Sequence, residues 1–409
     1  MKPFYSIHYA WVICIACLWL FICNMGLCSN ILTIYLPFIE ATGISDSMGS
    51  AILSVRCFSS FLTTFFVGIF YQKVSLRTGI LLASLTGAGG SLVFSVGGNA
   101  FIYYIGAVLA GIAYAAGAVY PVSLVLSNWF YERKGLAVGI SFAGSGVATM
   151  LFGPLLSAII LSHSLRTAFL FQALFLAVSA FAVFLVIRDT PEHKGISAFG
   201  RKQTIQSKAA AEASAPLPQS MLFMLAVMMF LNGGAGLAFS GHLSVLTRTC
   251  GYSAELAASI FSLFGLILVL SKLGSGALAD RIGVKHSSTL LILTFIAGCF
   301  LVIGMNGVNV FYPYALAVLL GVGASIYNTG PPLWAGEFSS GKEYARTLKW
   351  LQIFYNLGGI IFTVIPGFIA DHTGEYKTSY FLFAAMMSVS LLILLWAYRR
   401  KANVTPISS

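Results

Sequence analysis

Charged residues are scarce in this sequence: Asp, Glu, Lys and Arg together make up 9% of its 409 residues, while 58% are hydrophobic. Soluble domains carry roughly 25% charged residues, so this composition excludes a soluble globular protein. A membrane-spanning helix needs about 20 apolar residues, and the chain has room for about a dozen such helices joined by short loops. We therefore expect an all-α integral membrane protein without a soluble domain.

Acidic residues are the scarcer charge, with 12 Asp and Glu against 23 Lys and Arg. No Asp or Glu falls in the interior of a predicted span, since Glu255 and Glu337 lie at span ends and the others lie in loops or in the linker between the two sets of spans. Proton pumps and symporters commonly relay protons through such carboxylates. A drug or cation exporter, which is the alternative function that we keep open, is expected to hold one as well.

Motifs for nucleotide, metal and disulfide chemistry are also missing. The sequence has no GxxxxGK[ST] loop for nucleotide phosphates, so transport energy must come from gradients. The seven Cys residues lie mostly in apolar segments without His or acidic neighbours, which indicates packing rather than metal binding or disulfide formation. We predict no cofactor, no metal, no nucleic-acid partner and no enzymatic activity. A membrane sensor or enzyme would need an added domain or a catalytic cluster.

Hydropathy and turn residues predict twelve spanning helices in two sets of six. The first set covers residues 9–36, 47–71, 79–97, 101–127, 135–161 and 166–187, and the second covers 219–247, 254–278, 286–306, 310–334, 344–370 and 377–398. A polar stretch rich in Ala, Ser, Pro and basic residues separates the sets. The predicted domains are a bundle over 1–190, a cytoplasmic linker over 191–218 and a bundle over 219–409.

Basic residues are distributed unevenly across the predicted spans. Most of the 23 Lys and Arg fall on one side, and Arg166, Arg248 and Lys377 fall on the other. Because short loops rich in Lys and Arg face the cytoplasm, both termini are expected there. The apolar run after Lys2 is too long for a cleaved signal peptide and is predicted to remain as the first span. We expect a multi-pass monomer in a bacterial plasma (inner) membrane.

The two halves of the sequence repeat one another. GIFYQKVSLR at 68–77 matches GALADRIGVK at 276–285, with Gln72 where the second copy has Asp280. Further matched pairs are Gly111 with Gly321 and Pro121 with Pro331. Repeats of this kind are typical of transporters built from two bundles related by a pseudo-two-fold axis along the membrane normal. The substrate is then expected between the bundles, near the midplane.

Several of these motifs resemble those of the major facilitator superfamily. The GxLaDRxGxK turn at 276–285 carries the resemblance, and the basic Lys272 eight residues before Asp280 narrows it to the monocarboxylate and oxalate:formate transporter group, which usually has Arg there. NWFYERKGLAVGISFAGSG at 128–146, Arg166 before TAF, and PGFIADHTG at 366–374 also look like that group. Drug exporters of this superfamily are expected to have a GxxxGPxxGG pattern on the fifth helix. This sequence has Gly153-Pro154 without the Gly pair that should follow, which disfavours that alternative.

This resemblance covers both halves and implies the major facilitator fold. It also implies a secondary active transporter of small organic anions, such as lactate, pyruvate, formate or oxalate, that works by alternating access. Anion exchange and proton-coupled symport both remain open, so protons are a further expected partner. A neutral or sugar-like substrate is disfavoured because two cations lie inside predicted helices.

Those two cations are Lys272 and Arg56, and an ionisable residue inside a membrane indicates a functional site by default. Lys272 lies about 12 Å along its helix from Asp280, near the middle of a hydrocarbon core of about 30 Å. Arg56 lies in the outer half of its helix, where it is expected to bind substrate or to act at the entrance. The alternative for each is a side chain that extends to the lipid headgroups.

Other polar and aromatic residues are predicted to face the cavity: Asn24, Tyr120, Asn232, His242, Tyr327, Asn328, Tyr355 and Asn356. The Tyr hydroxyls would form a partly apolar cage for a short carboxylate. Ordinary interhelical packing is the alternative for each, and His242 is either a titrating switch or a structural residue. Residues predicted to act as cytoplasmic latches rather than ligands are Asp280, Arg281, Lys285 and Arg133.

Overall fold

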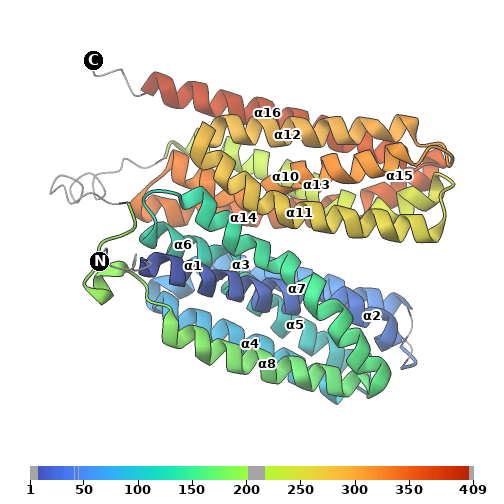
Figure 1. The fold of residues 1–409 in the computed structure, drawn as a ribbon, viewed down its shortest axis with the longest axis horizontal. Coiled ribbons are helices and arrows are strands. Elements are labelled where there is room, and N and C mark those ends of the chain that lie inside the picture. Colours follow the sequence, from blue (N-terminus) through green and yellow to red (C-terminus); the bar gives the residue numbers. More distant parts are fainter. Residues whose placement is uncertain (1–7, 41, 45, 201–216, 405–409) are drawn as a thin grey trace, which may run out of the picture. The chain divides into compact units, whose positions relative to one another are not determined.

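The computed structural model describes residues 8–40, 42–44, 46–200 and 217–404. Within these ranges the chain is helical apart from turns, loops and one isolated bridge, and twelve helical segments are long and apolar enough to cross a membrane. The predicted fold class is therefore confirmed. The chain divides into two compact units, Met1–Thr204 and Ile205–Ser409 (Figure 1), and each is described by itself.

The first unit forms six of these spans. Their helices are α1 (Tyr9–Leu20), the π-helix η1 (Phe21–Asn30), α2 (Leu32–Glu40), α3 (Asp46–Lys73), α4 (Leu76–Val96), α5 (Ala100–Gly117), α6 (Val119–Trp129), α7 (Lys134–Ser162) and α8 (Leu165–Val186), followed by the short 3-10 helix η2 (Pro191–Lys194). Two details were not predicted. The first span contains a π-helical segment, and the fourth span is broken at Ala118 between α5 and α6.

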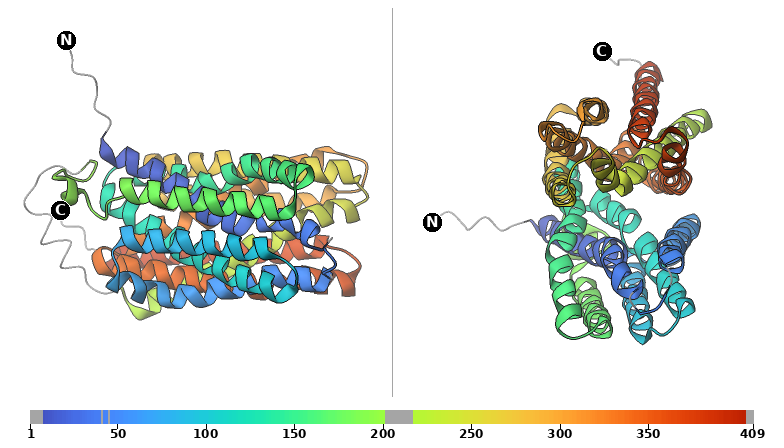
Figure 2. Two further views of the ribbon diagram at one scale, coloured as in Figure 1. Left: turned by 90° about the horizontal axis from the view of Figure 1, so that it is seen from below. Right: turned by 90° about the vertical axis from the view of Figure 1, so that its right-hand side faces the viewer.

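The second unit forms the other six spans. Their helices are α10 (Gln219–Thr249), α11 (Ala254–Ile282), α12 (Val284–Phe300), the 3-10 helix η3 (Leu301–Gly304), α13 (Phe311–Phe338), α14 (Gly341–Phe362), α15 (Ile365–Thr373) and α16 (Lys377–Val404). The predicted eleventh span is divided between α14 and α15, and α11 continues past its predicted end to include Asp280. In each unit the long helices run roughly parallel or antiparallel to one another (Figure 2).

Small residues let the helices of each unit pack closely. In the first unit a side chain at Gly144 of α7 would collide with the backbone carbonyl of Leu18 in α1. In the second unit a side chain at Gly358 of α14 would collide with the carbonyl of Phe230 in α10. Close backbone approach at small residues is the usual basis of helix association in membranes. The glycines therefore join the first span to the fifth and the seventh to the eleventh.

The segment after α8 packs back onto the first unit. The backbone N–H of Phe199 donates to the carbonyl of Trp129 (2.9 Å), and its carbonyl accepts from the N–H groups of Tyr131 (2.9 Å) and Glu132 (3.2 Å). The Phe199 ring contacts Trp11 at 5.7 Å between centroids. Residues 191–200 of the predicted linker thus contact the ends of α1 and α6, whereas residues 201–216 lie outside the described residues. The predicted domain boundaries remain a proposal.

Candidate functional site

Lys272 lies within α11, in the second unit, with its side chain 3% exposed. One turn later, the hydroxyl of Ser275 donates to the carbonyl of Lys272 (3.1 Å) and contacts the hydroxyl of Thr329 on α13 (3.2 Å). Both hydroxyl residues are buried. This pair ties the turn that carries Lys272 to the neighbouring helix. The burial argues against a side chain that extends to the headgroups.

Arg56 lies on α3, in the first unit, and its guanidinium is held by neighbouring helices. Nη1 donates to the hydroxyl of Ser29 in η1 (2.8 Å), and Nη2 donates to the thiol of Cys57 (2.9 Å). The guanidinium carbon lies 5.7 Å from the ring centroid of Tyr114 on α5. Nε is buried and has no hydrogen-bond partner among the described residues. These contacts direct the side chain into the unit rather than toward the headgroups.

Asn24 occupies the middle of η1 and is completely buried. Its Nδ2 donates to the hydroxyl of Ser84 on α4 (3.0 Å) and to the carbonyl of Gly117 (3.0 Å). Because a backbone carbonyl only accepts, the amide group must face Gly117, and the orientation of the side chain is fixed. Both amide hydrogens are therefore used within the first unit, and only Oδ1, which is buried without a hydrogen-bond partner among the described residues, is left to meet another group.

Gln172 was missed by the sequence analysis, although it forms the centre of a second polar network in the first unit. Its Oε1 accepts from the hydroxyl of Tyr35 (2.9 Å), and its Nε2 donates to the carbonyl of Leu27 (3.3 Å) and to the hydroxyl of Ser91 (3.0 Å). Leu27 belongs to η1, so this network supports the π-helical segment. A Gln in the middle of an apolar span is a signal that a search for polar residues within spans would have found.

Tyr327 lies on α13 in an aromatic surrounding within the second unit. Its ring centroid is 5.4 Å from that of Phe295 and 6.3 Å from that of Phe239. The hydroxyl is buried and has no hydrogen-bond partner among the described residues. A buried hydroxyl without a partner is costly, so this group favours a polar ligand.

The other residues predicted to line the cavity are described within their own units, Tyr120 in the first and the rest in the second. Tyr120 and Tyr355 are buried, Asn328 and Asn356 are half-buried, and Asn232 is buried and accepts a hydrogen bond from Ser390 (3.0 Å). The cage expected from the tyrosines draws on both units and stays a prediction.

His242 is half-buried on α10. Its Nδ1 lies 2.8 Å from the carbonyl of Ala238, and its ring stacks on Tyr376 at 5.7 Å between centroids. Because a carbonyl only accepts, Nδ1 is the donor in this contact. These contacts fit both predicted roles of His242, a switch or a structural residue.

The predicted latch residues lie at helix ends. Asp280 and Arg281 are exposed near the end of α11, and Lys285 is half-buried at the start of α12. Arg133 is exposed in the turn before α7, where its backbone is left-handed with φ of 55°.

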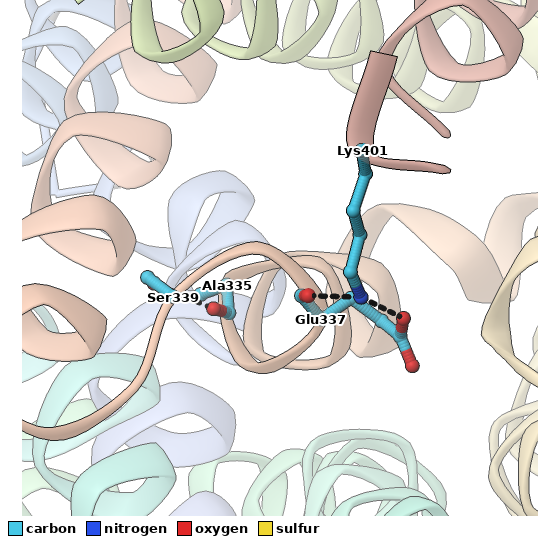
Figure 3. Close-up of polar contacts among 4 residues, drawn as sticks. All are labelled: Ala335, Glu337, Ser339 and Lys401. Carbon is cyan, nitrogen blue, oxygen red and sulfur yellow. Dashed lines mark hydrogen bonds and ion pairs between the residues drawn. The ribbon is translucent and has the colours of Figure 1, made fainter. Parts of the chain in front are cut away.

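An ion pair that was not predicted joins α16 to α13. Lys401 donates to the carbonyl of Glu337 (2.6 Å) and forms an ion pair with its carboxylate (3.2 Å), as Figure 3 shows. A cation near a helix C-terminus is favourable because the last carbonyls of the helix carry partial negative charge. This contact therefore stabilises the end of α13 within the second unit.

Comparison with known proteins identifies the family. The sequence matches the family model of the Major Facilitator Superfamily over residues 18–308 and 223–408. The chain belongs to the Major Facilitator Superfamily. This superfamily member is 26% identical over 362 residues to a "Putative tartrate transporter" of Agrobacterium vitis, with 81% of this chain and 79% of the relative covered. It is 22% identical over 415 residues to monocarboxylate transporter 12 of Mus musculus, with 94% and 85% covered.

Solved structures of the Major Facilitator Superfamily show the same fold. The transporter FucP superposes with a TM-score of 0.72 at 16% identity, with 95% of this chain and 99% of FucP covered. The expected resemblance to the monocarboxylate and anion transporters of the superfamily is confirmed. The protein is a multi-pass membrane transporter and not an enzyme.

Proposed function

We propose that this superfamily member is a secondary active transporter of small organic anions that moves a short mono- or dicarboxylate by alternating access across a bacterial plasma membrane, with both termini in the cytoplasm. The observation that carries the proposal is the burial of Lys272 within an apolar spanning helix. A cation at this depth is costly to hold in a low-dielectric environment, and an anionic ligand offsets that cost.

The relatives support the chemical class of the substrate. One is named for tartrate, a dicarboxylate, and another for monocarboxylates. A carboxylate bound by the Lys272 ammonium would present a short carbon skeleton to aromatic groups such as Tyr327, whose buried hydroxyl supplies a donor. Tyr120, Tyr355 and Asn328 remain proposed substrate contacts, each from its own unit. Asn24 contributes at most an acceptor, because its amide hydrogens are used.

Anion exchange is the mode of transport that we favour. Of the 12 acidic residues of the sequence, the 11 within the described ranges lie in loops or near helix ends, so none of these carboxylates is placed to carry a proton through the middle of a span. Returning an empty carrier would move desolvated cations through the membrane without an anion, which is unfavourable. Proton cotransport, with the proton on Lys272, on His242 or on the acid itself, is the competing mode. Asp280, Arg281, Lys285 and Arg133 are proposed as cytoplasmic latches in either mode.

Reconstituted protein tests the substrate class directly. Proteoliposomes should take up at least one labelled acid from a panel of L-tartrate, oxalate, formate, lactate and pyruvate, at a rate well above that of protein-free liposomes. The same vesicles should not accumulate the organic cation tetraphenylphosphonium. Uptake of the cation without uptake of any acid would overturn the proposal and would favour the drug or cation exporter.

A further inference from the structure

We propose that Arg56 forms a second anion-binding subsite, contained within the first unit, which takes a carboxylate group of the substrate on the Nε edge of its guanidinium. The inference rests on the proposed function, because it assigns a further subsite to the same class of substrate. Its position in the predicted outer half of α3 makes it a subsite for anions that arrive from the cell exterior.

The hydrogen-bond donors of Arg56 carry the argument. Nη1 donates to Ser29 and Nη2 to the Cys57 thiol, which is a weak acceptor, while Nε is buried without an acceptor among the described residues. A buried N–H on a charged group is costly to leave unsatisfied. A carboxylate is the acceptor that fits best, since its two oxygens accept parallel hydrogen bonds from two nitrogens of one guanidinium.

The surrounding backbone holds the guanidinium in place. Ser29 belongs to η1, and π-helical segments occur frequently at functional sites. A Cβ added to Gly111 of α5 would lie 2.5 Å from the carbonyl oxygen of Arg56, so the backbones of α3 and α5 are in close contact here. Tyr114, one turn after Gly111, then lies near the guanidinium and stabilises it through its ring. Three elements of the first unit thus position one side chain.

The sequence repeat shows that Arg56 and Lys272 are not equivalent. Gly111 packs against the backbone carbonyl of Arg56. In the second copy of the repeat, Gly321 takes the place of Gly111, and a Cβ added to it would lie 3.2 Å from the carbonyl oxygen of Phe264. Arg56 therefore corresponds to Phe264, eight residues before Lys272. Eight residues are about 12 Å along a helix. Arg56 and Lys272 thus lie at different levels of matched helices, and Arg56 lies nearer to the predicted outer end of its own helix.

Cys57 provides a probe of this subsite that does not depend on transport. The full-length protein would be treated with anionic 2-sulfonatoethyl methanethiosulfonate or with cationic 2-(trimethylammonium)ethyl methanethiosulfonate, and modification at Cys57 would be followed by mass spectrometry. The thiolate attacks the reagent, forms a mixed disulfide and expels methanesulfinate. Cys57 is only partly buried, unlike Cys28, which serves as an internal control.

We expect the anionic reagent to modify Cys57 at least fivefold faster than the cationic one, after correction for their rates with a free thiol. Millimolar L-tartrate or oxalate should slow the reaction. In Arg56→Gln both the preference and the protection should disappear, while Arg56→Lys should keep part of the preference. Equal rates with the two reagents, a lack of protection by either acid, or a lack of modification at Cys57 would each overturn the subsite.

Transport kinetics test the position of the subsite on the outer route. In Arg56→Gln the KM for external anion should rise at least fivefold, while the KM for internal anion stays within twofold of the wild-type value. An unchanged external KM would contradict the subsite even if the protein transports organic anions. If wild-type protein transports none of the acids but Cys57 shows the charge preference, the proposed function fails and the anion site at Arg56 stands.

Discussion

The carboxylate of Asp189 accepts a 2.8 Å hydrogen bond from the backbone N–H of Arg77, at the start of α4. Its other oxygen accepts from the N–H of Leu76 at 3.1 Å. The first copy of the repeated turn has Gln72 where the second copy has Asp280, and the carboxylate that caps α4 comes from the segment after α8. A carboxylate at a helix N-terminus satisfies free N–H groups and complements the helix dipole.

Asp189→Ala should therefore destabilise the protein by about 1 kcal/mol, the usual cost of losing a helix cap. Thermal unfolding in detergent, followed by tryptophan fluorescence, should show a lower Tm. The matched control is Glu192→Ala, which removes an exposed carboxylate three residues later in the same segment. If the two variants unfold at the same temperature, Asp189 does not cap α4 in solution.

Asn24→Ala should cost about 1–3 kcal/mol, because the carbonyl of Gly117 would be left buried without its donor. Ser84→Ala should cost less, since it removes only one of the two acceptors of the Asn24 amide. Chemical denaturation of the purified protein measures both effects. Thr86→Ala, at a half-buried position of the same helix where the hydroxyl donates to the carbonyl of Leu82, is the control and should be nearly neutral. A neutral Asn24→Ala would show that the bond to Gly117 contributes nothing.

Arg133→Gly should stabilise the turn before α7 by about 0.5–1 kcal/mol, because glycine adopts a left-handed backbone without the steric cost that Arg bears. The control is Tyr131→Gly in the same turn, which should destabilise the protein because Tyr131 does not have a positive φ. A lower Tm for Arg133→Gly would contradict this expectation. If Arg133 is also a latch, the same variant should transport more slowly despite its greater stability.

The positions of the spans could be predicted because each is a long apolar run bounded by turn residues. The interruptions within spans could not be predicted from hydropathy, because hydrogen bonds between residues far apart in the sequence support them. The π-helical segment receives Gln172 from α8 at the carbonyl of Leu27, and the break at Ala118 receives Asn24 at the carbonyl of Gly117. The packing of Phe199 onto the 129–132 turn likewise depends on tertiary contacts.

For the candidate site, the charged residues could be predicted from the sequence, but the residues around them could not. A Lys or Arg inside an apolar run stands out in the sequence, so Lys272 and Arg56 were found from their charge alone. The residues around them were not predicted, because Ser29 and Tyr114, which contact Arg56, and Thr329, which contacts Ser275 one turn after Lys272, have no distinctive sequence signal. Asn24 was predicted to face the cavity, and this stays a prediction: its amide nitrogen donates to Ser84 and to the carbonyl of Gly117 in the first unit, contacts that polarity alone does not indicate.

Exchange should dominate over net uptake if the carrier returns only with an anion bound. Proteoliposomes preloaded with unlabelled substrate should take up labelled substrate at least tenfold faster than empty vesicles, in the absence of a pH gradient. The control uses protein-free liposomes loaded in the same way. Equal uptake by empty vesicles with an acidic exterior would show that proton cotransport is the better description.

Lys272 carries the central claim, and counterflow of a labelled organic acid in proteoliposomes tests it most directly. Lys272→Ala should lose essentially all exchange while retaining the Tm and the amount of inserted protein of the wild type, because the variant lacks the cation that holds the carboxylate. Lys272→Arg should retain part of the activity, since the guanidinium keeps the charge but not the geometry. Exchange at the wild-type rate in correctly folded Lys272→Ala would contradict the account.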